Sequence, residues 1–261
     1  MVQSILFFCY FIFDSKIFKI VDKTTFKEKL AIAKVEMLIT THWLFFYASI
    51  KYSNISIGVV CYCLTSFFTA VFEPLINKKK FKFSELLLST FTLLGISLIF
   101  HFDTSYQLGI VLGVVSSAFA ALYTIFNERL VRTYNSKIIN YYQMIGGMIG
   151  WGFLLPVYLY FFPVESLVPN LKDSFYLVLL SLFCTVGLYV SFAEVLKKIP
   201  AFTVNLSFNL EPIYAIIMAF LFFGESKEVN SSFYVGLFFI MISVVLQSYF
   251  SVRKAKKLIV V

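Results

Sequence analysis

The sequence predicts an all-α integral membrane protein with eight complete transmembrane helices and a partial helix at its N-terminus. Of its 261 residues, 60% are hydrophobic and only 14% are charged, whereas soluble domains carry about 25% charged residues. A soluble fold of this length could not bury so much apolar surface in one core. Long apolar runs also alternate with short polar connections, which is the pattern of a polytopic helical protein.

Each predicted span is an apolar run near the length of about 20 residues that a helix needs to cross a hydrocarbon core. Because the connections are short, helices that are neighbours in the sequence are expected to form antiparallel hairpins. The eight runs are Leu30–Lys51, Ser56–Asn77, Phe83–Phe102, Gln107–Arg132, Lys137–Phe162, Asp173–Leu196, Pro200–Phe223 and Ser231–Val252.

The basic residues predict how these helices are oriented. Of 22 Lys and Arg, 18 lie in one set of connections and the C-terminal tail, 3 lie in the alternate connections, and Lys34 lies inside the first span. Basic loops stay in the cytoplasm, so a multi-pass protein of the cell membrane with a cytoplasmic C-terminus is expected. The 18 are Lys16, Lys19, Lys23, Lys27, Lys29, Lys78, Lys79, Lys80, Lys82, Arg129, Arg132, Lys137, Lys197, Lys198, Arg253, Lys254, Lys256 and Lys257.

The N-terminal segment Met1–Phe13 is almost wholly apolar, but its 13 residues are too few to cross a bilayer. A secretory signal would begin with a basic region and end in small residues. Here no Lys or Arg precedes the apolar run, and Asp14 follows it. We therefore interpret the segment as the cytoplasmic half of a span whose beginning is missing.

Several classes of function are not expected from the composition and the motifs. The net charge of +8 lies in short clusters between apolar runs rather than along one face, so nucleic-acid binding is not expected. Cys61 and Cys63 point about 200° apart on a helix, so they cannot share a metal, and buried thiols are expected. The sequence holds no Walker loop, H-E-x-x-H, nucleophile elbow or Rossmann fingerprint. No catalytic residue, metal, cofactor or enzyme activity is therefore expected.

One acidic residue near mid-membrane is the leading candidate for a functional site, because ionisable groups are costly at that depth. Glu211 lies about halfway along its span and is followed by Pro212. Proline has no N–H, so the carbonyl of Phe208 loses its helical partner. A helix break beside an acid predicts a substrate or proton site. The alternative is a neutral carboxyl hydrogen-bonded to Ser207.

Other polar residues within the spans complete the candidate site. Asn205 and Asn209 share a helix face, and they either line a cavity with Glu211 or hydrogen-bond neighbouring helices. His42, next to Trp43, is either a pH-responsive cavity residue or a packed histidine bonded to another helix. The predicted substrate-binding residues are Glu211, Asn209, Asn205, His42, Trp43 and Gln143.

The remaining acidic residues near basic ones are expected to form ion pairs at the membrane interface. A functional role stays open for Glu36 alone. The expected pairs are Glu73 with the Lys78 to Lys80 cluster, Glu128 with Arg132, Glu194 with Lys197 and Lys198, and Glu36 with a basic group such as Lys34.

Small residues recur every four positions on two helices, which lets helix backbones approach closely in lipid. Packing within one monomer is expected, and a homodimer through these faces is the alternative. The residues are Gly109, Gly113, Ser117 and Ala121 on one helix and Gly146 and Gly150 on the other.

Self-comparison finds a weak internal repeat at an offset of 145 residues. Ser66–Ala70 aligns with Glu211–Ala215, and Ala48 aligns with Ala193. Five crossings separate the related helices, and because five is odd the two copies must have opposite orientations. Inverted repeats are an architecture of transporters, whose halves rock around a central site.

Three short motifs resemble the EamA-type transporters of the drug/metabolite transporter (DMT) superfamily. His42–Lys51 resembles the third helix of that family, and Phe72–Ile76 resembles the segment before a basic loop. Asn209–Ala215, followed by Phe223-Gly224-Glu225, is similar to the end of the family's ninth helix. The motifs are short, so the resemblance rests on their order and spacing along nearly the whole chain.

The resemblance implies a ten-helix inverted-repeat fold of two five-helix halves, which here would be residues 1–103 and 104–261. Matched to that plan, the chain lacks the first helix and most of the second. Its eight full spans would be helices three to ten, and Met1–Phe13 would be the end of helix two.

The resemblance also implies a function, namely a secondary transporter that moves a small metabolite such as an amino acid by alternating access. Export is the expected direction. The expected partners are the small-molecule substrate and the lipid bilayer. A non-transporting remnant or an accessory membrane subunit is the main alternative, because the first helix is missing. An intramembrane enzyme is a weaker one, because no catalytic pair is evident.

Overall fold

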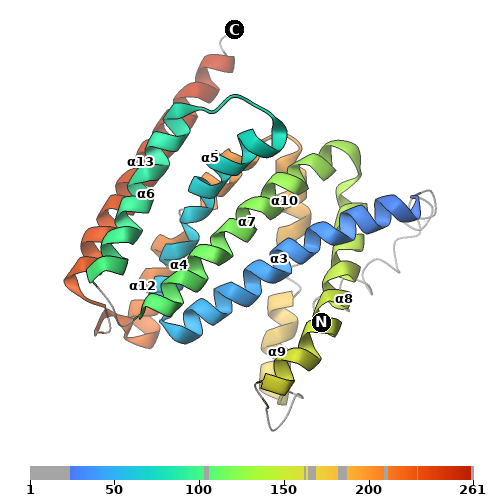
Figure 1. Cartoon of the computed structure of the whole chain (residues 1–261), viewed down its shortest axis with the longest axis horizontal. Helices are drawn as coiled ribbons and strands as arrows, with labels where there is room; N and C mark the ends of the chain where they lie inside the picture. Colours follow the sequence, from blue (N-terminus) through green and yellow to red (C-terminus); the bar gives the residue numbers. More distant parts are fainter. Residues whose placement is uncertain are drawn as a thin grey trace. The chain divides into compact units, whose positions relative to one another are not determined.

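A computed structural model of the chain describes residues 24–102, 106–161, 163, 169–181, 187–208, 211–227 and 229–259 (Figure 1). The described residues form helices and no strand, as the composition predicts. The segment Met1–Phe13 lies outside them. The helices are α3 (Phe26–Tyr52), α4 (Ile55–Tyr62), α5 (Leu64–Asn77), α6 (Phe83–Phe102), α7 (Gln107–Thr133), α8 (Ser136–Phe161), α9 (Leu171–Leu179), α10 (Leu188–Leu196), α11 (Ala201–Phe208), α12 (Glu211–Phe223), the 3-10 turn η3 (Glu225–Lys227) and α13 (Ser231–Ile259).

Two helical stretches of the described chain are long and apolar enough to cross a membrane, Ile55–Asn77 and Gln107–Thr133. Shorter apolar helical stretches are Ser89–Leu98, Ile213–Phe223 and Ser231–Ser243. The total of eight spans therefore stays a prediction. Where one span was predicted over Asp173–Leu196, the structure has α9 and α10, and residues 182–186 lie outside the described residues.

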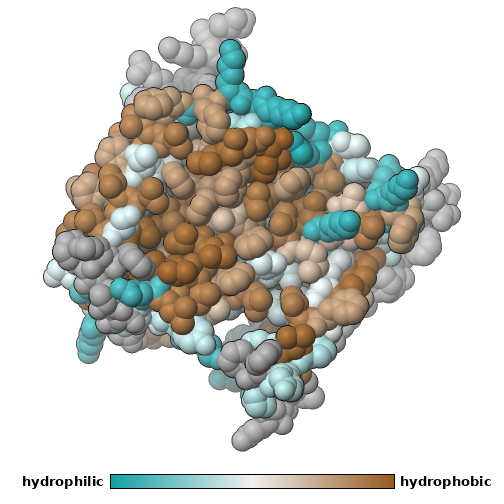
Figure 2. All heavy atoms as spheres, in the orientation of Figure 1, coloured by the Kyte–Doolittle hydropathy of each residue, from teal (hydrophilic) through white to brown (hydrophobic). Residues whose placement is uncertain are grey.

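Hydrophobic residues dominate the molecular face seen in Figure 2, as expected for a surface that meets lipid. Large apolar side chains are exposed along several helices. Phe83 and Leu94 on α6, and Leu108 and Val111 on α7, are examples. In water a surface with so many exposed apolar side chains would aggregate. These side chains therefore agree with the membrane protein that the composition predicts.

The chain forms two compact units, unit 1 (Met1–Thr40 and Phe126–Lys198) and unit 2 (Thr41–Ile125 and Ile199–Val261). The long helices α3 and α7 contribute residues to both units. These units are regions of dense contact and differ from the predicted repeat halves, which stay a prediction.

In unit 2, α13 packs along α6, α4 packs against α12, and α5 packs against both α6 and α11. The α6–α13 contact is close, because a Cβ atom on Gly95 would stand 2.5 Å from the backbone oxygen of Gly236. The apolar core of this unit consists of Ile57, Val60, Cys61, Cys63, Leu64, Ile96, Ile110, Ile216, Phe233 and Ile240. Cys61 and Cys63 are buried free thiols, as predicted.

The predicted small-residue faces make close helix contacts within the chain, as expected. On α7, a Cβ atom added to Gly109 would meet Ser53 at 2.6 Å, and one added to Gly113 would meet Cys61 at 2.6 Å. In unit 1, a Cβ atom on α8 at Gly146 would meet the backbone oxygen of Ala33 at 2.6 Å. The homodimer alternative stays a prediction.

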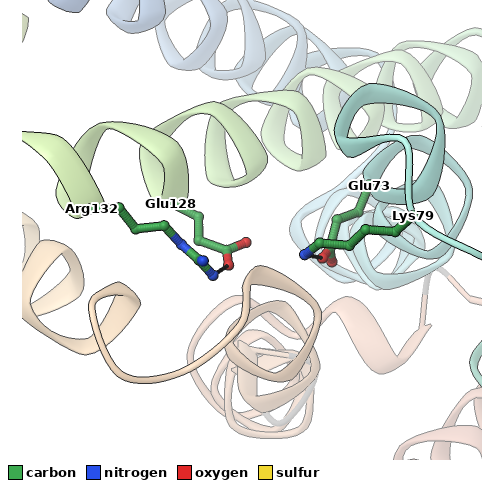
Figure 3. Close-up of polar contacts among 4 residues, drawn as sticks. All are labelled: Glu73, Lys79, Glu128 and Arg132. Atoms are coloured by element: carbon green, nitrogen blue, oxygen red, sulfur yellow. Dashed lines mark hydrogen bonds and ion pairs between the residues drawn. The ribbon is translucent and has the colours of Figure 1, made fainter.

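Three of the predicted ion pairs are confirmed. Each joins residues that are close in sequence. Figure 3 shows Glu128 with Arg132 one turn further along α7 and, separately, Glu73 with Lys79, joined at 2.9 Å. Lys78 adopts a left-handed conformation (φ 51°) at the end of α5, which turns Lys79 back toward Glu73. The third pair joins Glu194 and Lys197 at 2.8 Å.

The predicted pairing of Glu36 with Lys34 is wrong. Glu36 is buried, and its Oε2 atom has no hydrogen-bond partner among the described residues. The two residues are two positions apart on one helix, so their side chains point about 200° away from each other.

Candidate functional site

His42 lies on α3 within unit 2 and is bound to α7 through Ser116. Its Nδ1 atom stands 3.0 Å from the carbonyl oxygen and 2.8 Å from the Oγ atom of Ser116, and that Oγ stands 3.0 Å from the His42 carbonyl oxygen. If Oγ–H donates to the His42 carbonyl, then Nδ1–H donates to Ser116. We assign that tautomer, which leaves Nε2 as the acceptor of a neutral ring.

Aromatic rings surround the imidazole of His42. Phe46, one turn further along α3, stacks on it with ring centroids 5.7 Å apart, and Tyr62 of α4 packs against it at 5.4 Å. Phe46 and Tyr62 also meet edge to face at 6.2 Å. Trp43 is half-buried. The imidazole is therefore held in a fixed orientation beside the end of α4.

Glu211 is the first residue of α12, and its side chain is exposed at the protein surface. Its carboxyl lies within electrostatic range of the Tyr62 phenol and the Cys63 thiol. This proximity follows from the packing of α12 on α4. Tyr62 thus touches His42 and lies near Glu211, so two of the predicted residues approach a common aromatic neighbour.

Asn205 is buried on α11, where its amide connects two other helices of unit 2. Its Nδ2 donates to Thr69 Oγ1 of α5 at 2.8 Å, and its Oδ1 accepts from Thr124 Oγ1 of α7 at 3.0 Å. This is the inter-helix bonding that the sequence left open as one of two alternatives. Asn209 lies outside the described residues, as does the Pro212 side chain, although the Pro212 backbone forms the second position of α12.

Gln143 belongs to unit 1, where it is fully buried on α8. Its Nε2 donates to Asn127 Oδ1 of α7 at 3.1 Å. The bond ties α8 to the last turns of α7.

Glu225 is a polar residue of unit 2 to which sequence analysis assigned no role. Gly224, before it, ends α12 with φ of +70°, a left-handed conformation that glycine adopts without strain. The turn brings the Glu225 carboxylate to the start of α4, where it accepts from the backbone N–H groups of Ile55 and Ser56 at 2.9 Å each. Ser56 Oγ donates to it as well, at 2.6 Å. The Gly-Glu pair therefore caps the first turn of α4.

The partners Ser116, Tyr62, Thr69 and Thr124 were also missed. Each is an ordinary residue for a membrane helix, and its partner is 20 to 136 residues away in the sequence. The only available signal was the recurrence of small hydroxyl residues along α5 and α7, which is common in membrane helices.

An apolar cavity of about 730 Å³ lies elsewhere in unit 2, between α5, α6 and α7. None of the predicted site residues lines it. Its walls suit a hydrocarbon chain rather than a polar metabolite. Among the described residues, no group of three or more His, Cys, Asp or Glu could hold a metal ion.

Comparison with known proteins places the chain among transporters. Residues 107–249 match the model of the EamA-like transporter family. An uncharacterized transporter of Clostridium kluyveri is 26% identical over 80% of this chain and 68% of its own length. The uncharacterized transporter YdfC of Bacillus subtilis is 28% identical over 66% of this chain and 56% of its own length. One of Haemophilus influenzae is 25% identical over 80% of this chain and 71% of its own length.

A solved crystal structure of a protein shares the fold. It aligns with a TM-score of 0.56 and 10% sequence identity, and the match covers 86% of this chain and 76% of the other. At that identity the likeness concerns the fold alone.

Proposed function

The chain belongs to the EamA-like transporter family, and on that premise we propose that it is a secondary transporter of a small metabolite. It is a helical membrane protein, and its relatives are transporters. Under the proposal, transport proceeds by alternating access across the cell membrane, in the direction of export. The basic loops support a cytoplasmic C-terminus, because 18 of the 22 Lys and Arg lie on the side that contains it.

One observation carries the proposal, namely the polar and aromatic groups that meet at the junction of α4 and α5. Tyr62 ends α4 and Leu64 begins α5, with Cys63 in a turn between them. The Tyr62 ring packs against His42 at 5.4 Å, and α12, which begins at Glu211, packs on α4. A break in a helix with polar groups beside it supports a substrate site, because secondary transporters bind substrate at discontinuous helices.

The residues nearest this junction supply suitable chemistry. Glu211 offers a carboxylate for the amino group of a metabolite such as an amino acid. Tyr62, at the end of α4, offers a hydroxyl and an aromatic face, and His42 packs against that ring. Asn205 has the supporting role of joining α5, α7 and α11. Asn209 and Trp43 stay proposed members of the site, whereas Gln143 belongs to unit 1 and its predicted role stays a prediction.

The test is uptake of radiolabelled amino acids and related small amines by proteoliposomes that contain the purified chain, with empty liposomes as the blank. Glu211→Gln should lower the flux about tenfold or more, because a charge-assisted contact to substrate contributes about 1.5–3 kcal/mol. Glu194→Gln is the matched control, since Glu194 forms a half-exposed pair with Lys197. Its flux should equal that of the wild type.

Two results would contradict the proposal in different ways. Equal flux in the wild type and in Glu211→Gln would remove Glu211 from the site while leaving a transporter. No flux above empty liposomes for any substrate would favour the accessory-subunit or remnant alternative.

A further inference from the structure

Glu36 is a buried acid that the proposed substrate site does not use. It lies ten residues after the first residue of α3, about 15 Å along the helix axis. Its exposed fraction is 7%, and its Oε2 atom has no hydrogen-bond partner among the described residues. A buried polar atom without a partner is rare, because it costs about 1–3 kcal/mol. The position therefore calls for an explanation.

The carboxyl of Glu36 fits into a seam where α3 meets α8 within unit 1. A Cβ atom on Gly147 would stand 3.2 Å from Glu36 Cγ and 3.3 Å from Oε1, so the carboxyl packs on the bare backbone of α8. Gly146 and Gly150 meet Ala33 and Met37 in the same way. Any side chain at position 147 would press on the carboxyl.

The two helices of the seam run parallel. The contacts of α3 with α8 join Lys29 to Tyr142, Ala33 to Gly146 and Met37 to Gly150, so both partners advance by four residues each time. The predicted topology agrees, because four crossings separate the two helices. Side chains at successive turns thus close the seam on both sides of Glu36.

No described charged group neutralises a carboxylate at this position. On α3, Lys29 stands over the Tyr142 ring at 5.6 Å, and Lys34 lies on another side of the helix. On α8, the titratable groups on the cytoplasmic side are Lys137, Tyr141 and Tyr142, and none of them forms an ion pair with Glu36. On the part of α7 in unit 1, Glu128 is paired with Arg132, and Arg129 lies over Phe126 at 5.7 Å.

A lone charge in such a seam is unfavourable by several kcal/mol, whereas the protonated acid is neutral and can be packed. The closed seam therefore holds the acid form. Separation of α3 from α8 would admit water, and water stabilises the carboxylate. Opening and closing of the seam are thus linked to release and uptake of one proton.

We propose that Glu36 is a proton-binding site, whose carboxyl takes up a proton when α3 and α8 close and releases it when they separate. The proposal rests on the proposed transport function, for which it supplies the coupling ion. Each cycle moves one proton and breaks no other bond. A sodium ion would need several oxygen ligands, whereas the described contacts of the Glu36 carboxyl at Gly147 are with the bare backbone of α8.

The experiment compares two transport modes of the full chain in proteoliposomes. Counterflow at equal pH measures substrate exchange, and accumulation under an imposed pH gradient measures coupling to protons. In the wild type, a gradient of one pH unit should drive up to about tenfold accumulation for one coupled proton. Glu36→Gln, which mimics the protonated acid, should keep counterflow and lose accumulation. Gly147→Ala keeps the carboxyl but crowds it, so its pH dependence should shift.

The outcomes separate this proposal from the transport function itself. Wild-type flux that ignores the pH gradient, or follows a sodium gradient instead, would overturn the proton site and leave the transporter. Glu36→Gln that still accumulates substrate would overturn it as well.

If no variant transports, infrared difference spectroscopy of the purified chain still shows whether Glu36 is protonated. A protonated carboxyl signal at neutral pH that is absent in Glu36→Gln, and present in Glu211→Gln, would retain the site. Its absence from the wild type would refute the site.

Discussion

Two buried glutamates of this protein have opposite surroundings. In unit 2, Glu225 is 5% exposed and accepts three hydrogen bonds, from the N–H groups of Ile55 and Ser56 and from Ser56 Oγ. In unit 1, Glu36 is 7% exposed, and its Oε2 accepts none from the described residues. The two carboxyl groups are thus about equally buried, but they differ in the hydrogen bonds that they accept.

The difference indicates which acid stabilises the fold and which one is free to change state. The negative charge of Glu225 meets the positive end of the α4 helix dipole and two N–H groups that lack helical partners. Glu36 has no such compensation, so its charge is unstable in the closed seam. A fully bonded acid stabilises one structure, whereas an acid with an unpaired oxygen responds to protons.

The largest expected effect is that of Glu225→Ala, which removes all three hydrogen bonds. The loss should lower the free energy of unfolding by about 3 kcal/mol, since a bond to a charged acceptor contributes about 1.5–3 kcal/mol. Chemical unfolding in mixed micelles measures it. Glu194→Ala, at a half-exposed ion pair, is the control and should cost under about 1 kcal/mol. A similar small loss for Glu225→Ala would show that water replaces the cap.

The next effect concerns the seam that encloses Glu36. Gly146→Ala would push a methyl group to within 2.6 Å of the Ala33 backbone oxygen, and such overpacking costs about 1–3 kcal/mol. Gly152→Ala, on the same helix, meets nothing within 4 Å. It should be neutral or stabilising by up to about 1 kcal/mol, from better helix propensity. Equal unfolding midpoints for the two variants would mean that the seam is not closely packed.

Asn205→Ala should have a smaller effect, although Asn205 is as buried as the two acids. Its partners Thr69 and Thr124 already reach the carbonyl oxygens of Thr65 and Ala120 at 2.7 and 3.0 Å. Both hydroxyls therefore keep a partner, and the cost should be about 1 kcal/mol. A loss of more than about 3 kcal/mol in the free energy of unfolding would mean that the hydrogen bonds of the Asn205 amide are stronger than ordinary ones.

The smallest effect is expected at Glu28, an acid that is well bonded but only half-buried. Thr25 donates to it from its backbone N–H at 2.8 Å and from Oγ1 at 2.7 Å, and these bonds lower the pKa of Glu28 below its usual value of 4.5, those from the Thr25 side chain most strongly. A lowered pKa stabilises the folded state above pH 4.5, and this contribution disappears as the pH falls through the folded-state pKa.

Unfolding of Thr25→Ala across the acidic range checks this sign. The variant should be slightly less stable than the wild type at neutral pH, and the difference should shrink in acid to the contribution of the bond from the Glu28 N–H to Thr25 Oγ1. A difference that grows as the pH falls would contradict the assignment.

Sequence analysis succeeded where partners are close along the chain. The pairs Glu73–Lys79, Glu128–Arg132 and Glu194–Lys197 follow from spacings of three to six residues, and helix geometry or a single turn brings them together. The close approach at Gly146 likewise follows from the small-residue pattern. These features need no knowledge of which helix lies next to which.

Contacts between distant segments could not be predicted. The Glu225 cap joins residues 169 and 170 positions apart, and the Asn205 bonds span 81 and 136 positions. They depend on the packing of α4 with α12 and of α5 with α11, which apolar patterning does not specify. The unpaired oxygen of Glu36 was missed because nearby Lys34 suggested a partner, although it lies on another side of the helix.

The measurement that tests the comparison most directly is the free energy of unfolding of Glu36→Gln beside that of Glu225→Gln. Both variants replace a carboxyl group with an amide of nearly the same shape. Glu36→Gln should remain within about 0.5 kcal/mol of the wild type, because the amide mimics the packed neutral acid, whereas Glu225→Gln should lose about 1.5 kcal/mol or more. If Glu36→Gln is the more damaging of the two, Glu36 is a structural carboxylate, and the distinction drawn here between the two acids is wrong.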